Sequence, residues 1–166
     1  MRGFLKFEQA NDLNPAHNMN KASEYLKSSG SIETLEIGNL VDLVISDAIE
    51  AGSSDIHIEP WDASLVVRVR LNGVLQELLH LPIELMEKVS GRLKVMANLV
   101  SYEMDRPQEG HAQTGAEMGG VELRMSFFPV IRGNHAGGVL RGEKIVIRIF
   151  DPNKRSFNLD EIGFED

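Results

Sequence analysis

The segment from residue 65 to residue 79 restricts the fold more than any other part of the chain. Apolar side chains at every second position from 65 to 71 form one row, and Arg68 and Arg70 stand in the opposite row. Asn72-Gly73 then supplies two residues that tolerate positive φ angles, and alternation resumes over 74–79. The pattern predicts a β-hairpin in an antiparallel sheet with one buried face.

Two helices are expected around this hairpin. Residues 37–49 place apolar side chains at the spacing of a single helix face, and Pro82 opens a second helix that runs to about Asn98. The strand-like runs lie at residues 55–59, 65–71, 74–79, 110–114, 121–128 and 144–150. The order αβββαβββ predicts an α+β fold, an antiparallel sheet with helices packed on one face.

The length of 166 residues favours one domain with unstructured ends. We expect residues 1–31 to form a linker or arm, with at most a helical turn at 23–27, and residues 32–150 to form the domain. Residues 151–166 become polar and are expected to leave the domain. The glycine-rich residues 132–142 predict an exposed, mobile hairpin tip.

Composition excludes several classes of site. The chain has no cysteine, which excludes disulfides, thiolate metal sites and a cysteine nucleophile. The net charge of -8 disfavours a general nucleic-acid binder, because such binding needs a basic surface. No apolar run approaches the length of a membrane helix, so we expect a soluble, cytoplasmic chain.

The acidic charge is concentrated in one stretch. Residues 31–63 contain eight Asp or Glu residues and no Lys or Arg. Such a run is typical of a solvated surface, and an acidic docking surface for a basic partner is the alternative interpretation.

Residue types also bear on a metal site and on a nucleotide-phosphate site. His57 lies between Asp55 and Glu59 on one strand face, a set that could bind a metal ion, although alternating charges on a strand are more typical of solvation or ion pairing. We therefore predict no metal site. A loop that wraps nucleotide phosphates ends in Gly-Lys-Ser or Gly-Lys-Thr, and this chain has no Gly-Lys pair.

Several motifs occur together in a recognisable order. They lie at residues 54–60 (SDIHIEP), 67–75 (VRVRLNGVL), 92–97 (RLKVMA), 106–110 (RPQEG), 121–126 (VELRMS), 142–149 (GEKIVIRI) and 159–164 (LDEIGF). Over residues 36–164 the chain resembles the N-terminal, pre-motor domain of the type II secretion and type IV pilus assembly ATPases. The resemblance implies a PAS-like fold, with residues 151–166 beginning the linker to a motor domain.

The chain departs from the family pattern at a few positions. Asn72 stands where the family has Asp, and it suits the turn equally well. His111 stands where the family has an arginine, so a role of that arginine cannot be transferred. The glycine-rich loop before Gly142 is longer than usual, and no phosphate loop is present.

The resemblance also implies a function and partners. The domain would be a non-catalytic part of a hexameric ATPase and would bind no cofactor alone, with ATP and Mg expected in the full-length protein. Its partners would be the motor domain, the neighbouring subunits and the inner-membrane platform proteins. Neither nucleic acid nor direct membrane insertion is expected, and the location would be cytoplasmic, peripheral to the inner membrane.

Arg124 and Arg148 are the candidate site residues. In the family this domain lends arginines to a nucleotide site, and both residues alternate with apolar neighbours on strands that match. The hypothesis is that they reach the γ-phosphate of nucleotide held by the motor domain. The alternative is that they pair with Asp55, Glu59 or Glu122 and only stabilise the sheet. We interpret Arg68 and Arg70 as surface ion pairs.

A different class of function remains open at this point. PAS-like folds also occur as stand-alone sensory or adaptor domains that bind a small ligand or a protein partner. A sensor of this kind predicts an enclosed apolar pocket between the sheet and the helices.

Overall fold

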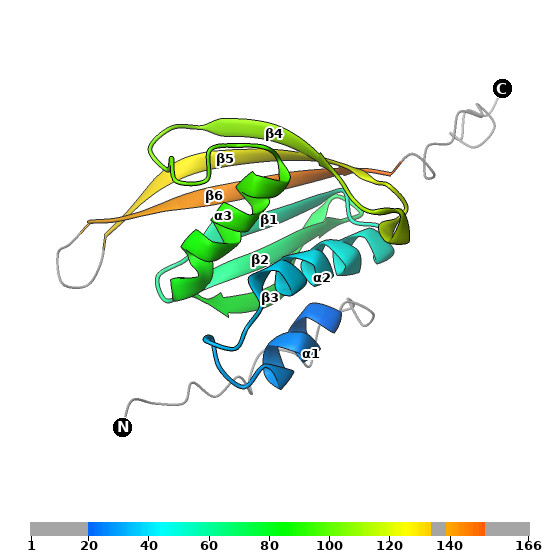
Figure 1. Cartoon of the computed structure of the whole chain (residues 1–166), viewed down its shortest axis with the longest axis horizontal. Coiled ribbons are helices and arrows are strands. Elements are labelled where there is room, and N and C mark those ends of the chain that lie inside the picture. Colours follow the sequence, from blue (N-terminus) through cyan, green and yellow to red (C-terminus); the bar gives the residue numbers. More distant parts are fainter. Residues whose placement is uncertain (1–19, 134–138, 152–166) are drawn as a thin grey trace.

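The computed structural model describes residues 20–133 and 139–151. The chain forms α1 (Lys21–Ser28), α2 (Ile37–Glu50), β1 (Asp55–Pro60), β2 (Ser64–Leu71), β3 (Val74–Pro82), η1 (Ile83–Leu85), α3 (Met86–Met96), β4 (Gln108–Gln113), η2 (Ala116–Met118), β5 (Glu122–Gly133) and β6 (Val139–Phe150). The six strands form one sheet in the order β3-β2-β1-β6-β5-β4, and every neighbouring pair is antiparallel (Figure 1). The α+β prediction is confirmed.

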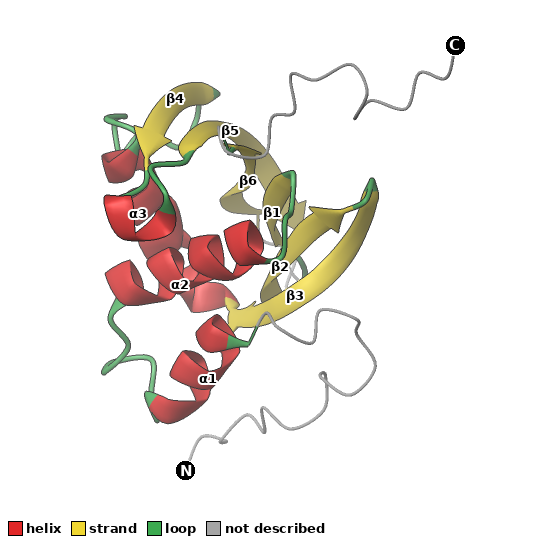
Figure 2. Cartoon of the chain, turned by 90° about the vertical axis from the view of Figure 1, so that its right-hand side faces the viewer, coloured by secondary structure: helices red, strands yellow, loops and turns green. Residues whose placement is uncertain are grey.

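All three α-helices lie on the same side of the sheet (Figure 2). Apolar side chains from α2, α3 and the inner face of the sheet form one continuous core, in which Leu40, Leu93, Phe127 and Ile147 are completely buried. The opposite face of the sheet carries no helix of the described chain and presents the polar residues that alternate with this core. It is called the open face below.

The local predictions for the first hairpin and the helices are confirmed. Asn72 and Gly73 have φ angles of 49° and 82°, the two positive values that a tight hairpin turn of this kind requires. Helix α2 ends before Gly52, which also has a positive φ of 75°. The second predicted helix begins as the short 3-10 turn η1 and continues as α3.

The glycine-rich loop is shorter than the sequence suggests. Strands β5 and β6 stay paired as far as Gly133 opposite Val139, so that only residues 134–138 remain for the predicted mobile tip, and these lie outside the described residues. The additional strand pairs extend the hairpin beyond the expected ends at 128 and 144.

Helix α1 falls within the stretch predicted to be a linker or arm. It packs on α2 through Ala22 and Leu26, which are buried in the common core. The boundary between arm and domain at residue 31 stays a prediction. Residues 1–19 of the arm and 152–166 of the expected linker lie outside the described residues.

Candidate functional site on the open face of the sheet

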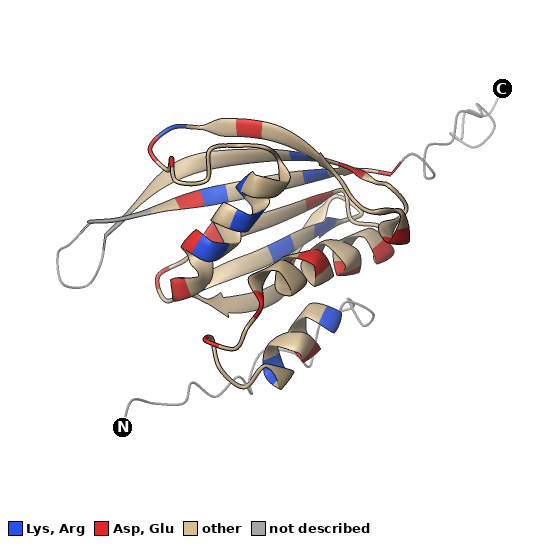
Figure 3. Ribbon diagram, viewed as in Figure 1, with Lys and Arg blue, Asp and Glu red and all other residues tan. Residues whose placement is uncertain are grey.

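Arg124 and Arg148 lie side by side on the open face. They are direct cross-strand partners in the ladder between β5 and β6. Their inward neighbours Leu123, Met125 and Ile147 are at most 1% exposed, which turns both arginines away from the helices. Their side chains are 57% and 64% exposed, and basic bands cross β2, β5 and β6 in Figure 3.

Within the part of the chain that the structure describes, each arginine pairs with a carboxylate. The Nε of Arg124 donates to Glu122 at 3.3 Å, and its guanidinium lies 4.7 Å from the centre of the Phe150 ring. The Nε of Arg148 donates to Asp55 at 3.0 Å. The alternative of carboxylate pairing is therefore present in the geometry, yet both arginines stay more than half exposed, and their nucleotide role stays a prediction.

Two like charges directly opposite each other on neighbouring strands are unfavourable for a sheet. Arg124 and Arg148 have this arrangement. Each pairs with a different carboxylate, Glu122 or Asp55, and neither carboxylate bridges the two guanidinium groups in the contacts described here. An anion that contacted both guanidinium groups would relieve this repulsion directly, because the hydrogen bonds to Glu122 and Asp55 seen among the described residues use Nε and not the terminal nitrogens.

The arginine pair belongs to a row of side chains that crosses the sheet. The strand registers place Arg70, Asp55, Arg148, Arg124 and His111 at successive positions from β2 to β4. His111 lies 3.6 Å from the same Glu122 carboxylate that pairs with Arg124. The departure from the family pattern at position 111 therefore lies beside the candidate site.

Arg68 and Arg70 form the expected ion pairs. Arg68 lies 2.6 Å from Glu59 and Arg70 lies 3.2 Å from Asp55. Their side chains are 24% and 33% exposed, so these pairs are more enclosed than the surface pairs predicted from the sequence.

His57 occupies the middle of the open face. Neither ring nitrogen has a hydrogen-bond partner in the structure. Burial lowers the pKa of His57 below its ordinary value of 6.5, and the charges of Arg70 and Lys144 act in the same direction against Glu59 and Asp55. Within the described ranges, no three His, Asp or Glu side chains come together in an arrangement that could hold a metal ion.

The acids of residues 31–63 are largely engaged within the fold. Asp42 pairs with Arg92 of α3 at 3.6 Å and Glu50 pairs with Lys21 of α1, while Asp47 is fully buried. Figure 3 shows these acidic bands along α2 beside the basic bands of α3. Asp55 and Glu59 are held by cations of the sheet. These contacts favour internal pairing over an acidic docking surface.

A small cavity lies between the sheet and the helices. The cavity there, lined by apolar residues of α2, α3 and the sheet, has a volume of ≈ 10 Å³. A cavity needs about 10–15 Å³ to hold a single water molecule. This cavity is too small for the ligand of a sensory domain.

Comparison with known proteins assigns the chain to a family. A family model described as "Type II/IV secretion system protein" matches residues 31–166. The chain is 34% identical to the type IV pilus assembly ATPase PilB of Pseudomonas aeruginosa over 140 residues, which cover 84% of this chain and 23% of that protein. It belongs to the type II/IV secretion system protein family.

Other relatives in the secretion family agree. The chain is 32% identical to the type IV pilus assembly ATPase TfpB of Acinetobacter baylyi, with 90% of this chain and 27% of that protein covered. It is 37% identical to the type II secretion system protein E of Xanthomonas campestris, with 75% of this chain and 20% of that protein covered. The chain thus spans about a quarter of the length of the curated relatives it matches. Across residues 20–133 and 139–151, no helix is both long and apolar enough to cross a membrane.

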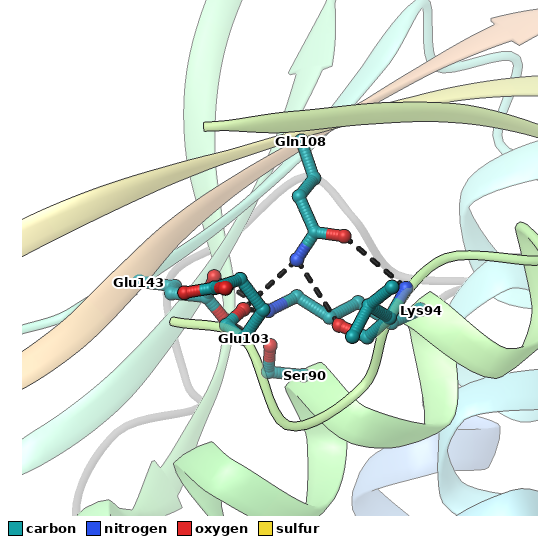
Figure 4. A network of polar contacts seen from close by, with 6 residues as sticks. Ser90, Lys94, Glu103, Gln108 and Glu143 are labelled. Carbon is teal, nitrogen blue, oxygen red and sulfur yellow. Dashed lines mark hydrogen bonds and ion pairs between the residues drawn. The ribbon is translucent and has the colours of Figure 1, made fainter. Parts of the chain in front are cut away.

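Three of the secretion-family motifs meet in a buried network that the sequence analysis did not predict (Figure 4). Lys94 and Glu143, both 0% exposed, form an ion pair of 2.7 Å between α3 and β6. Ser90 donates to the same carboxylate, and Lys94 also donates to the carbonyl of Glu103. Gln108 donates to that carbonyl at 2.8 Å. The network fastens the segment between α3 and β4 to the sheet.

Proposed function

We propose that this chain is the pre-motor domain of a secretion or pilus-assembly ATPase and that it closes over nucleotide bound to the motor domain. Arg124 and Arg148 then contact the γ-phosphate. The observation that carries the proposal is their pairing across β5 and β6, which puts two exposed guanidinium groups on one face. Family membership supports the larger context.

The chemistry suits guanidinium groups. The γ-phosphoryl group presents several charged oxygens, and an arginine can donate to two of them while it remains fully ionised at any physiological pH. Negative charge on these oxygens is stabilised as the phosphoryl group is transferred. A pair of arginines held on adjacent strands approaches such a group as one rigid unit.

The proposal divides the work between this domain and a motor. ATP and Mg would be held by a phosphate loop of the motor domain, so this chain alone would not hydrolyse ATP. The complete protein would act in the cytoplasm as a hexamer, bound at the inner membrane through platform proteins. A first check is whether the reading frame continues beyond Asp166 into a Gly-Lys-Ser or Gly-Lys-Thr loop.

The decisive experiment replaces each arginine in the complete ATPase. Arg124→Ala and Arg148→Ala should each lower kcat on the order of a hundredfold, the usual effect of removing one donor from a developing negative charge. Lys88→Ala is the control, because it removes an equal charge from an exposed position on α3, on the other side of the sheet. An ATPase rate equal to wild type in both arginine variants would disprove the γ-phosphate role.

Thermal unfolding of the same variants tests the alternative. If the arginines only stabilise the sheet, the loss should appear in the melting temperature and not in the rate of the folded protein. Exposed ion pairs contribute at most about 1 kcal/mol, so we expect the variants to remain folded at the assay temperature.

A further inference from the structure

Asp55 stands between Arg70 and Arg148 in the row of side chains that crosses the open face. The ladders of β1 place Asp55 directly opposite Arg70 of β2 on one side and directly opposite Arg148 of β6 on the other. Its side chain is 8% exposed, whereas that of Arg148 is 64% exposed. The buried carboxylate of Asp55 therefore contacts an arginine side chain that is otherwise largely exposed to solvent.

Both oxygens of this carboxylate are occupied. Oδ1 accepts from the Nε of Arg148 at 3.0 Å, and Oδ2 accepts from the Ser54 hydroxyl at 2.8 Å and lies 3.2 Å from the Nε of Arg70. Burial by itself raises the pKa of Asp55, but the hydrogen bonds from Ser54 and Arg148 and the two arginine charges outweigh it and hold the pKa below its ordinary value. The group remains ionised at neutral pH.

The backbone of the residue before Asp55 is hydrogen-bonded to both neighbouring strands, β2 and β6. Ser54 donates its N–H to the carbonyl of Arg70 in β2, and its own carbonyl accepts from the N–H of Ile149 in β6. Asp55 thus begins β1 between two strands that already hold its neighbour. Rotation of the carboxylate or displacement of its backbone would break several of these bonds together.

Arg124 has no comparable anchor. Its partner Glu122 is 49% exposed and stands on the same strand, so this pair is open to solvent. The two arginines therefore differ in how firmly their side chains are held. Arg148 pairs with a buried carboxylate, whereas Arg124 contacts the Phe150 ring and an exposed carboxylate.

We propose that Asp55 is a positioning residue that aims Arg148 at the anion. Among the described residues, Asp55 engages the Nε of Arg148 and not the terminal nitrogens, which can therefore donate outward. The inference rests on the proposed function of Arg148. Groups that are held in their productive geometry before the reaction contribute more to rate than groups that must first be ordered.

A double-mutant cycle in the complete ATPase tests this role. Asp55→Asn removes the charge and keeps the shape, and it should lower kcat about tenfold or more, as expected for a displaced catalytic contact. Combined with Arg148→Ala, it should cause no further loss, because a residue that acts through Arg148 has nothing left to position. Ser54→Ala, at an exposed position, should give a smaller loss of two- to threefold that also disappears in the Arg148→Ala background.

Glu59→Gln is the matched control. Glu59 lies on the same strand face as Asp55, its side chain is 12% exposed, and it holds Arg68 and Lys144 at 2.6 and 2.9 Å. A loss of rate that merely reflects a weakened sheet should therefore appear equally in Glu59→Gln. We expect this variant to keep the wild-type kcat per folded molecule.

The outcomes separate the two proposals. A normal rate in Arg148→Ala would overturn the proposed γ-phosphate contact of Arg148, and with it the positioning role of Asp55. A reduced rate in Arg148→Ala with a normal rate in Asp55→Asn would overturn the positioning role alone, as would losses that simply add in the double variant. If Asp55→Asn does not fold, the Ser54→Ala cycle decides, since an additive loss there has the same meaning.

Discussion

At the scale of single residues, His57 is the group whose titration should be visible in the stability of the domain. Its folded pKa lies below 6.5 because the ring is buried and because Arg70 and Lys144 repel a further positive charge. Between the two pKa values the unfolded chain binds a proton that the folded chain does not bind. The stability contribution of the neutral ring is therefore complete above pH 6.5 and is lost as the pH falls.

We predict that the free energy of unfolding of residues 1–166 decreases when the pH is lowered from 7 towards 5. The slope attributable to one such proton cannot exceed about 1.4 kcal/mol per pH unit. His57→Gln should flatten the profile in this range. Urea unfolding at a series of pH values measures this pH dependence. An unchanged slope in His57→Gln would contradict its assignment to His57.

The identity of single site residues was only partly predictable from the sequence. Alternation alone put Arg124 and Arg148 on the polar side of their strands, and the structure adds that they face each other. From the sequence, Asp55 was a possible partner of the arginines, but the burial of its carboxylate was not predictable, because its contact with Arg148 joins residues 93 positions apart along the chain.

At the scale of elements, one buried acid joins α2 to the start of α1. Asp47 of α2 accepts a hydrogen bond of 3.0 Å from the backbone N–H of Ala22 in the first turn of α1. Asp47 thereby accepts a hydrogen bond from one of the first N–H groups of α1, which have no partner within their own helix. Burial raises the pKa of Asp47 despite the opposing backbone hydrogen bonds of Ala22 and Lys21.

We predict that Asp47→Ala loosens α1 by about 1–2 kcal/mol, the usual effect of losing a helix cap. Amides of residues 22–28 should exchange faster with deuterium, while those of β1 and β6 should keep their protection. Asp47→Asn keeps an acceptor and removes a buried charge, so it should behave like the wild type. Asp42→Ala, which removes an exposed acid from the same helix, is the control. Equal exchange in Asp47→Ala and Asp42→Ala would show that α1 does not depend on this contact.

Elements with strong local signals were predictable, and those fixed by distant contacts were not. The hairpin turn at Asn72-Gly73 and helix α2 follow from turn chemistry and periodicity. Helix α1 has eight residues and is marginal by itself, so its stability comes from packing on α2, which the local sequence does not reveal.

At the scale of the whole molecule, the motifs that carry the family resemblance explain how the helices are joined to the sheet. Gly110 of RPQEG lies where an added Cβ would come within 2.8 Å of the carbonyl of Ala97, so β4 can approach the end of α3 only with glycine there. The motif residues Lys94, Gln108 and Glu143 come from three segments and form one network. Sequence reasoning recognised these motifs by resemblance but could not state their physical purpose.

The Lys94 and Glu143 pair should be the strongest single link between the helix layer and the sheet. Both side chains are fully buried, so removing one partner leaves a charge without compensation. We predict that Lys94→Met lowers the free energy of unfolding by about 3–5 kcal/mol, whereas Lys94→Met combined with Glu143→Leu recovers much of this loss because no buried charge remains. Urea unfolding of residues 1–166 provides the measurement, with the exposed pair variant Arg106→Met as the control. A double variant less stable than Lys94→Met would show that the pair, together with its bonds to Ser90 and the Glu103 carbonyl, stabilises the molecule by more than it costs to bury.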